Sequence, residues 1–193
     1  MEEFEVKFLN IDPVAMEAKL KAIGATKVAE YLYRRDNFDY PDLRLDKAGG
    51  WIRVRTDGEH TTLTFKQRLG ITSHDGSTND AGMEEIECTI GNFDIACKFF
   101  LAIGFISKVY MENRRIRYMK DGVEFDLDFW PGLEPYMEIE AKSWEDVDKG
   151  IAWLELNRAD KKIFTTTQVY QMKGINPLDY SRMTFQGLVK KVV

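Results

Sequence analysis

The stretch EFEVKF, residues 3–8, alternates strictly between charged and apolar side chains. Such alternation is typical of a β-strand with one polar and one apolar face. The three apolar side chains can then enter a core, while Glu3, Glu5 and Lys7 lie in a row on the other face. A single water-exposed strand would explain this pattern if it occurred once, so its meaning depends on whether other strands repeat it.

Six further segments repeat the combination of one apolar and one polar face. They are predicted strands at residues 51–55, 61–66, 83–90, 109–118, 123–129 and 136–141. The polar faces group charges of one sign two residues apart. Their members are Glu3, Glu5 and Lys7; Arg53 and Arg55; Thr62, Thr64 and Lys66; Glu85 and Glu87; Asn113, Arg115 and Arg117; Glu124, Asp126 and Asp128; and Glu138 and Glu140. Because seven strands share this pattern, chance is a poor explanation. The repetition indicates that their polar faces together form a functional surface.

The connections between these strands predict an antiparallel sheet. An eighth extended segment covers residues 31–40, and Asp-Gly pairs at 57–58 and 121–122 are hairpin signals. Amphipathic helices are predicted at residues 13–24, 92–104 and 143–157, and weaker helical signals continue through residues 159–193. The absence of a regular strand–helix alternation favours an α+β fold, with an antiparallel sheet that is open or closed into a barrel.

The composition predicts a soluble globular protein with one domain over residues 1–193. A net charge of −5 argues against a broad nucleic-acid surface, and the apolar runs are too short to span a membrane. The acidic start lacks the basic segment of a signal peptide. Cys88 and Cys97 form no paired motif, and the histidines form no zinc or nucleophile motif. We therefore predict a cytoplasmic protein.

A charged face of this kind can bind metal ions together with phosphate groups. Two carboxylates at i and i+2 of a strand can point at one cation, and Mg²⁺ and Mn²⁺ prefer oxygen ligands. Facing Arg and Lys pairs need an anion with several oxygens, and the arginine fork matches phosphate. If the sheet closes with this face inside, the costly buried charges find partners in one another, in a metal ion and in a polyphosphate.

These motifs resemble those of the CYTH family, the triphosphate tunnel metalloenzymes. The family's mark is E-x-E-x-K at the N-terminus, here residues 3–7. Further motifs follow in order: R-x-R at 53–55, T-x-K at 64–66, E-x-E at 85–87, R-x-x-Y at 115–118, L-D at 127–128, G-L at 132–133 and E-x-E at 138–140. The resemblance covers about residues 3–142. It implies an eight-stranded antiparallel β-barrel, the triphosphate tunnel, with helices packed outside and a C-terminal helical segment at about 143–193.

The resemblance also implies roles for the charged residues. The metal ligands, for Mg²⁺ or Mn²⁺, would be Glu3, Glu5, Asp128, Glu138 and Glu140. The triphosphate would be bound by Lys7, Arg53, Arg55, Lys66, Arg115 and Arg117. The catalytic group would combine Lys7 and Arg115 with Glu85 and Glu87. These two glutamates either bind a second metal ion, orient water or balance the positive charges of the tunnel.

The sequence departs from the family pattern at several points. Residues 35–39 match the family's D-x-Y-F-D, so Asn37 replaces its tyrosine, and Asn113 stands where a lysine is common. Beyond residue 142 the likeness is thin; Lys190 or Lys191 either closes the tunnel or is solvated. The four tryptophans, Trp51, Trp130, Trp144 and Trp153, are assigned to packing rather than to base stacking.

Three functions remain open. We favour a metal-dependent hydrolase of a triphosphate (tripolyphosphate, thiamine triphosphate or a nucleoside triphosphate), because attack by water needs no nucleobase recognition. The alternatives are a class IV-type adenylyl cyclase, which makes cyclic AMP and pyrophosphate from ATP, and a polyphosphate-binding module without turnover. The expected partner is a triphosphate-containing small molecule. A homodimer is left open, and the tail is a lid, a packing element or a dimer contact.

Overall fold

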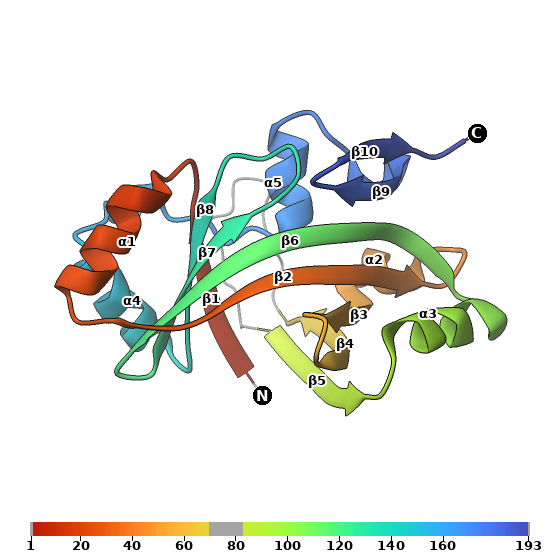
Figure 1. Cartoon of the computed structure of the whole chain (residues 1–193), viewed down its shortest axis with the longest axis horizontal. Coiled ribbons are helices and arrows are strands. Elements are labelled where there is room, and N and C mark those ends of the chain that lie inside the picture. Colours follow the sequence, from red (N-terminus) through yellow and green to blue (C-terminus); the bar gives the residue numbers. More distant parts are fainter. Residues whose placement is uncertain (1, 70–82, 193) are drawn as a thin grey trace.

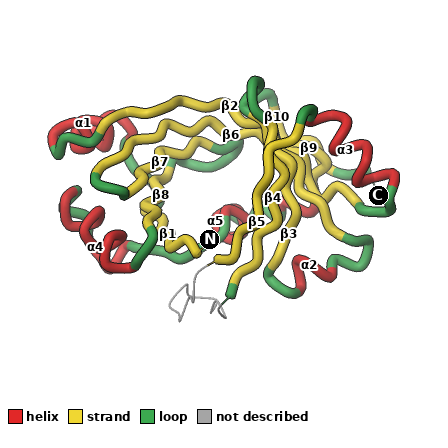
Figure 2. The backbone as a smooth tube through the Cα atoms, turned by 90° about the horizontal axis from the view of Figure 1, so that it is seen from below, coloured by secondary structure: helices red, strands yellow, loops and turns green. Residues whose placement is uncertain are grey.

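Eight antiparallel strands form a closed ring in the computed structural model, which describes residues 2–69 and 83–192. They are β1 (Glu2–Phe8), β2 (Thr26–Asp39), β3 (Gly50–Thr56), β4 (Thr61–Arg68), β5 (Met83–Ile90), β6 (Ile106–Lys120), β7 (Val123–Phe129) and β8 (Tyr136–Ala141). The order is β6-β2-β3-β4-β5-β1-β8-β7, and pairing of β7 with β6 closes it. The predicted eight-stranded antiparallel barrel is therefore confirmed (Figures 1 and 2).

The helices lie outside the ring, as predicted. They are α1 (Pro13–Ala22), α2 (Arg44–Lys47), α3 (Phe93–Ala102), α4 (Trp144–Trp153) and α5 (Thr166–Met172). Figure 1 shows the long strands β2 and β6 crossing the molecule side by side, with α1 and α4 near one end and α3 near the other. In the described part of the chain, no helix is long and apolar enough to cross a membrane.

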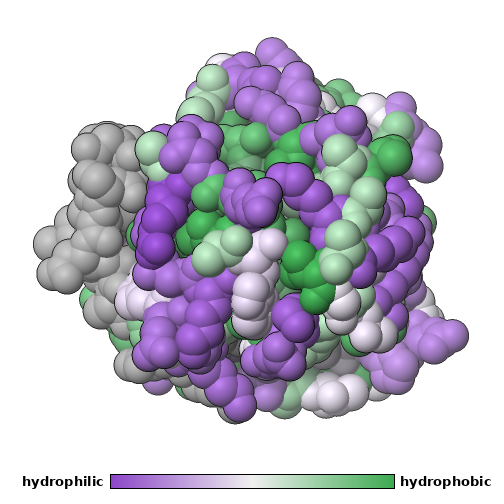
Figure 3. All heavy atoms as spheres, turned by 90° about the vertical axis from the view of Figure 1, so that its left-hand side faces the viewer, coloured by the Kyte–Doolittle hydropathy of each residue, from purple (hydrophilic) through white to green (hydrophobic). Residues whose placement is uncertain are grey.

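The hydrophobic core lies between the outer face of the barrel and these helices. At one end, Val6 and Ile139 on the sheet pack in a buried cluster with Leu20 of α1 and Ile151 of α4. At the other end, Phe100 of α3 belongs to a second buried cluster on β2 and β3. Figure 3 shows the end formed by α1 and α4, where most of the visible surface is hydrophilic. With the apolar faces turned outward, the charged faces are left to line the interior.

Local signals explain where the helices begin. Asp12 caps α1 by accepting hydrogen bonds from the backbone N–H groups of Val14 and Ala15, and Pro13 takes the first helical position. Ser143 caps α4 by accepting from the N–H of Asp146. Both helices therefore begin where the sequence predicts amphipathic helices. Helix α2 was not predicted, because its stabilising contact is tertiary: the buried Asp39 accepts from the N–H groups of Leu45 and Asp46.

The prediction of a helical segment through to residue 193 is wrong for its last part. Residues 180–190 form a hairpin of β9 (Tyr180–Thr184) and β10 (Gly187–Lys190). Strand β9 runs parallel to β6 and pairs with it at Tyr110 and Met111. Met183 of β9 and Tyr170 of α5 are buried in one cluster with Val109 and Met111. The apolar spacing that suggested a helix is therefore that of a hairpin packed on the barrel, and one domain over residues 1–193 stays a prediction.

Candidate active site

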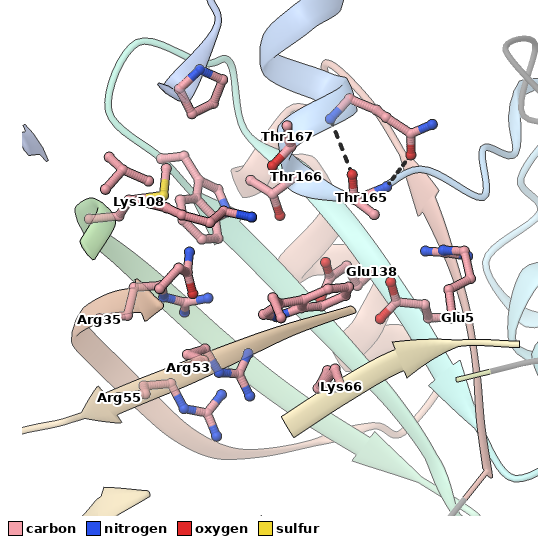
Figure 4. A pocket seen from close by; sticks show the side chains of 18 of the residues that line it. Glu5, Arg35, Arg53, Arg55, Lys66, Lys108, Glu138, Thr165, Thr166 and Thr167 are labelled. Carbon is pink, nitrogen blue, oxygen red and sulfur yellow. Dashed lines mark hydrogen bonds between the residues drawn. The ribbon is translucent and has the colours of Figure 1, made fainter. Parts of the chain in front are cut away.

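A cavity of about 490 Å³ lies within the barrel, and its walls carry most of the predicted site residues. Eleven of them line it: Glu5, Lys7, Arg53, Arg55, Lys66, Glu85, Glu87, Arg115, Arg117, Glu138 and Glu140. The side chain of Glu3 lies outside the described part of the structure. Figure 4 shows the arginines Arg53 and Arg55 on one side of the cavity and Glu5 and Glu138 on the other.

Lys7 is held between two carboxylates. The side chain is 2% exposed, and its Nζ lies 3.0 Å from Glu5 Oε1 and 2.9 Å from Glu138 Oε1. Antiparallel pairing of β1 with β8 places Lys7 directly opposite Glu138. Burial opposes the charge on Lys7, but Glu138 and Glu5 raise its pKa above the ordinary value. Burial also opposes the charge on Glu138, but Lys7 and Arg115 hold its pKa well below the usual range.

Arg115 and Arg117 of β6 are positioned by acids of the neighbouring strands. Arg115 Nε donates to Asp128 Oδ1 over 2.8 Å, Nη1 lies 2.6 Å from Asp126 Oδ2, and Nη2 contacts Glu138. Arg117 donates to both oxygens of Asp126, at 2.8 and 2.7 Å. Asp126 and Asp128 are 1% and 0% exposed and do not line the cavity. Asp128 therefore lies behind Arg115, and its role as a metal ligand stays a prediction.

On the opposite wall, β3, β4 and β5 form a second mixed group. Lys66 Nζ lies 2.6 Å from Glu85 Oε2, and Arg53 Nη2 is 3.7 Å from Glu85 Oε1. Arg55 Nη2 is 3.7 Å from Glu87 Oε2, which accepts a hydrogen bond from the Thr64 hydroxyl at 2.6 Å. Burial and the neighbouring Arg55 lower the pKa of Arg53 to about 10. Glu85 and Glu87 thus lie among the cations, which supports charge balance without deciding among their predicted roles.

The sequence analysis missed several cavity residues. Arg35 lies on the inner face of β2 opposite Arg55, and Lys108 of β6 pairs with Asp46 of α2. Two tryptophans assigned to packing, Trp51 and Trp130, also line the cavity. Trp51 has the same parity as Arg53 on β3, a signal that could have revealed it. Arg35 could have been found in the same way, since it is two residues before Asn37.

The C-terminal segment covers the cavity from one side. Thr165, Thr166 and Thr167 line it at the start of α5, as Figure 4 shows. A capping box fixes this turn: Gln168 N–H donates to Thr165 Oγ1 at 3.2 Å, and Thr165 N–H donates to Gln168 Oε1 at 2.8 Å. No motif in the sequence indicated these residues, because their position depends on how the tail folds back over the barrel.

The acidic wall has the donor chemistry of a divalent-metal site. Glu5 and Glu140 both line the cavity and are direct cross-strand partners, a like-charge pair that is destabilising without a cation. Carboxylate oxygens are the ligands that Mg²⁺ and Mn²⁺ prefer. Among the residues the structure describes, no three acidic, His or Cys side chains are gathered closely enough to form a metal site. The carboxylates of this wall therefore fit a metal ion by the type of their oxygen donors, although they are not gathered around one point. In this structure Glu5 contacts the ammonium group of Lys7.

Comparison with known proteins identifies the family. The CYTH domain matches residues 1–165, and the chain belongs to this family. No curated protein gives a significant match.

Solved structures are similar in fold. A conserved hypothetical protein from Pyrococcus furiosus is 21% identical, with a TM-score of 0.72 over 86% of this chain and 99% of that one. An adenylyl cyclase candidate from Hippeastrum, reported to reveal a dominant triphosphatase activity, is 16% identical, with a TM-score of 0.62 over 93% and 99% of the two chains.

Proposed function

We propose that this protein is a divalent-metal-dependent triphosphatase that cleaves a phosphoanhydride bond of a triphosphate inside the barrel. The observation that carries the proposal is the convergence on one cavity of cations from β1, β3, β4 and β6 and of the carboxylates of Glu5, Glu138 and Glu140. A triphosphate offers many oxygens to such cations, and a metal ion offers a counter-charge to such acids. The triphosphatase activity reported for the Hippeastrum relative supports this choice.

The cations would bind the phosphate oxygens and stabilise the charge that develops on them. Arg115 and Arg117 are oriented by buried carboxylates, and Lys7 by Glu5 and Glu138, so little reorganisation is needed when substrate binds. Such preorganised charges contribute most in a water-poor site. Arg53, Arg55 and Lys66 would hold the substrate from the opposite wall and align it for attack.

Glu5, Glu138 and Glu140 would hold the metal ion, with Glu3 as a further predicted ligand. Mg²⁺ or Mn²⁺ would supply positive charge at the phosphate oxygens when bound. Glu85 or Glu87 would orient a water molecule and accept its proton during attack on the terminal phosphorus. The described residues that line the cavity include no Cys, Ser or His, so we predict direct hydrolysis without a covalent enzyme intermediate.

The second candidate is an adenylyl cyclase, in which the ribose 3′-hydroxyl of ATP replaces water as the nucleophile. Trp51 and Trp130 line the cavity, where their rings are suited to stacking on a nucleobase, and this observation supports the cyclase as an alternative.

The third candidate function is a polyphosphate-binding module without turnover. A cytoplasmic location remains a prediction from the cysteine content.

Product analysis tests these functions directly. The protein is incubated with Mg²⁺ or Mn²⁺ and with tripolyphosphate, thiamine triphosphate or ATP, while phosphate, pyrophosphate and cyclic AMP are followed. Glu5→Gln removes a cavity carboxylate, and Glu59→Gln makes the same change at an exposed position outside the cavity. We expect metal-dependent phosphate release that only Glu5→Gln abolishes. Cyclic AMP with pyrophosphate would identify a cyclase, and tight binding without product would identify a binding module.

A further inference from the structure

Among the described residues, Arg35 differs from Arg53, Arg55, Arg115 and Arg117 of the cavity in having no carboxylate as a direct partner. The residue is 7% exposed and lines the cavity from β2. In the described part of the chain, no carboxylate forms an ion pair with its guanidinium; Nη2 donates to Asn113 Oδ1, and Nε has no hydrogen-bond partner. Arg115, by contrast, contacts three carboxylates. A buried cation without a counter-charge is costly, so its presence needs an explanation.

The surroundings of Arg35 increase this cost. Its direct partner on β3 is Arg55, and Arg53 lies opposite the next inward residue of β2, Asn37. Burial first, and then the charges of Arg53, Arg55 and Arg115, lower the pKa of Arg35 well below the ordinary arginine value. Figure 4 shows Arg35, Arg53 and Arg55 together on one side of the cavity. The carboxylate of Asp128 opposes this shift, and Glu85 and Glu87 lie near Arg53 and Arg55, so the positive charge around Arg35 is compensated only in part.

The side chain of Arg35 is nevertheless firmly positioned. Its guanidinium carbon lies 4.6 Å from the centre of the Trp130 ring and 5.6 Å from that of Tyr33. Asn113, which accepts its hydrogen bond, is itself fixed by donating to Asp128 Oδ1 over 3.1 Å. The indole N–H of Trp130 is also buried without a partner. A fixed cation with an unused N–H group, beside another unused donor, is prepared to receive an anion.

We propose that Arg35 binds the terminal phosphoryl group of the substrate and is a specificity-determining residue for linear triphosphates; this rests on the proposed function. A terminal phosphoryl group carries about −1.5 to −2 charges and three free oxygens. It therefore suits a cation that has no local counter-charge better than an inner phosphoryl group, which carries a single charge. The arginine fork binds two of its oxygens at once.

The test compares the wild type with Arg35→Gln, Arg35→Lys and Arg34→Gln. Arg34 is the adjacent residue, is itself exposed and does not line the cavity, so its replacement removes the same charge away from the cavity. Isothermal titration calorimetry in a chelator, without divalent metal so that no substrate is hydrolysed, measures binding of tripolyphosphate, which is linear, and of trimetaphosphate, a cyclic trimer without terminal phosphoryl groups. The unfolding temperature is measured without ligand.

We expect Arg35→Gln to weaken tripolyphosphate binding by about 10- to 100-fold, the effect of losing one charged hydrogen-bonding group. Trimetaphosphate binding should change by less than about threefold, because this cyclic anion has no terminal phosphoryl group and would interact with Arg35 only through solvent. Arg35→Lys should recover part of the affinity, and Arg34→Gln should match the wild type. The ligand-free unfolding temperature of Arg35→Gln should stay level or rise, because a buried unpaired charge is removed.

Two results would overturn the assignment: equal weakening of both anions, or unchanged tripolyphosphate affinity in Arg35→Gln. A lower ligand-free unfolding temperature of Arg35→Gln, with affinity retained, would indicate a structural role only and would also overturn it. Wild-type protein that binds neither anion would contradict the proposed function itself, and the role of Arg35 with it. The two failures are therefore distinguishable.

Discussion

Replacement of Lys7 by methionine should destabilise the folded protein and not merely inactivate it. Lys7 is 2% exposed and is the cation between Glu5 and Glu138, at 3.0 and 2.9 Å. Methionine fills a similar volume but leaves both carboxylates without this partner. Breaking a buried ion pair from one side costs about 3–5 kcal/mol. Because Glu138 keeps its contact with Arg115, we expect the lower end, about 3 kcal/mol.

This loss corresponds to an unfolding temperature about 6–12 °C lower for a chain of this size. Tryptophan fluorescence during thermal unfolding measures it. The double variant Lys7→Met/Glu138→Gln should recover much of the stability, because the more buried of the two stranded charges is gone, without restoring phosphate release. Lys27→Met is the control, since Lys27 forms only a surface pair with Glu30 and should change the temperature little.

The difference in stability between the wild type and Lys7→Met should also depend on pH. In the wild type, Lys7 and Arg115 lower the pKa of Glu138, so this stabilisation is present above the unfolded carboxyl pKa of about 4.3 and is lost as the pH falls further. The gap between wild type and Lys7→Met should therefore narrow from pH 7 to about pH 3. A variant within about 2 °C of wild type at pH 7, or a gap that widens in acid, would refute the reasoning.

Two other substitutions test burial outside the cavity. Burial raises the pKa of Asp36 to about 6, so the folded state binds the proton more tightly than the unfolded state and stability falls as the pH rises from about 4 to 6. Asp36→Asn should therefore stabilise the protein by up to about 3 kcal/mol at pH 7 and by little at pH 4, as measured by urea unfolding. A lower free energy of unfolding of this variant at pH 7 would count against this prediction. Gly150→Ala should lower the free energy of unfolding by about 1–3 kcal/mol, because the new Cβ would lie 3.0 Å from Ile139 Cγ2. Gly91→Ala is the control, since open space surrounds that position and no loss is expected. Equal stability of the two variants would show that the contact between helix and sheet relaxes freely.

The strands of the barrel could be predicted well because charged and apolar residues alternate along each of them. Residues 3–8 alternate with period two, and the same holds for the other charged segments, so both their extended conformation and their inward face follow locally. The limits of the longest strands were less predictable: β2 begins at Thr26 and β6 extends from Ile106 to Lys120, beyond the predicted residues 31–40 and 109–118. Pairing between these two strands stabilises those ends.

Eleven of the predicted residues line the cavity, but the contacts among them could not be predicted. The face of β7 was assigned correctly, yet Asp128 lies behind Arg115 instead of reaching the cavity, because the longer arginine of the adjacent strand covers the shorter carboxylate. Arg35 was missed, although its parity on β2 places it beside Arg55. The tail was misread because the apolar residues of β9 and β10 also fit a helical spacing.

The sequence by itself determined the alternating strands, their charged faces and the chemistry of the residues on them, because side chains on a strand take opposite sides whatever the strand pairs with. Only the tertiary structure decided which charges meet. Lys7 contacts Glu138 across a gap of more than a hundred residues, and no carboxylate of the described residues pairs with Arg35, because strand order and register set the distances between side chains. The closing of β7 onto β6 likewise decided that these faces line a cavity instead of a flat surface.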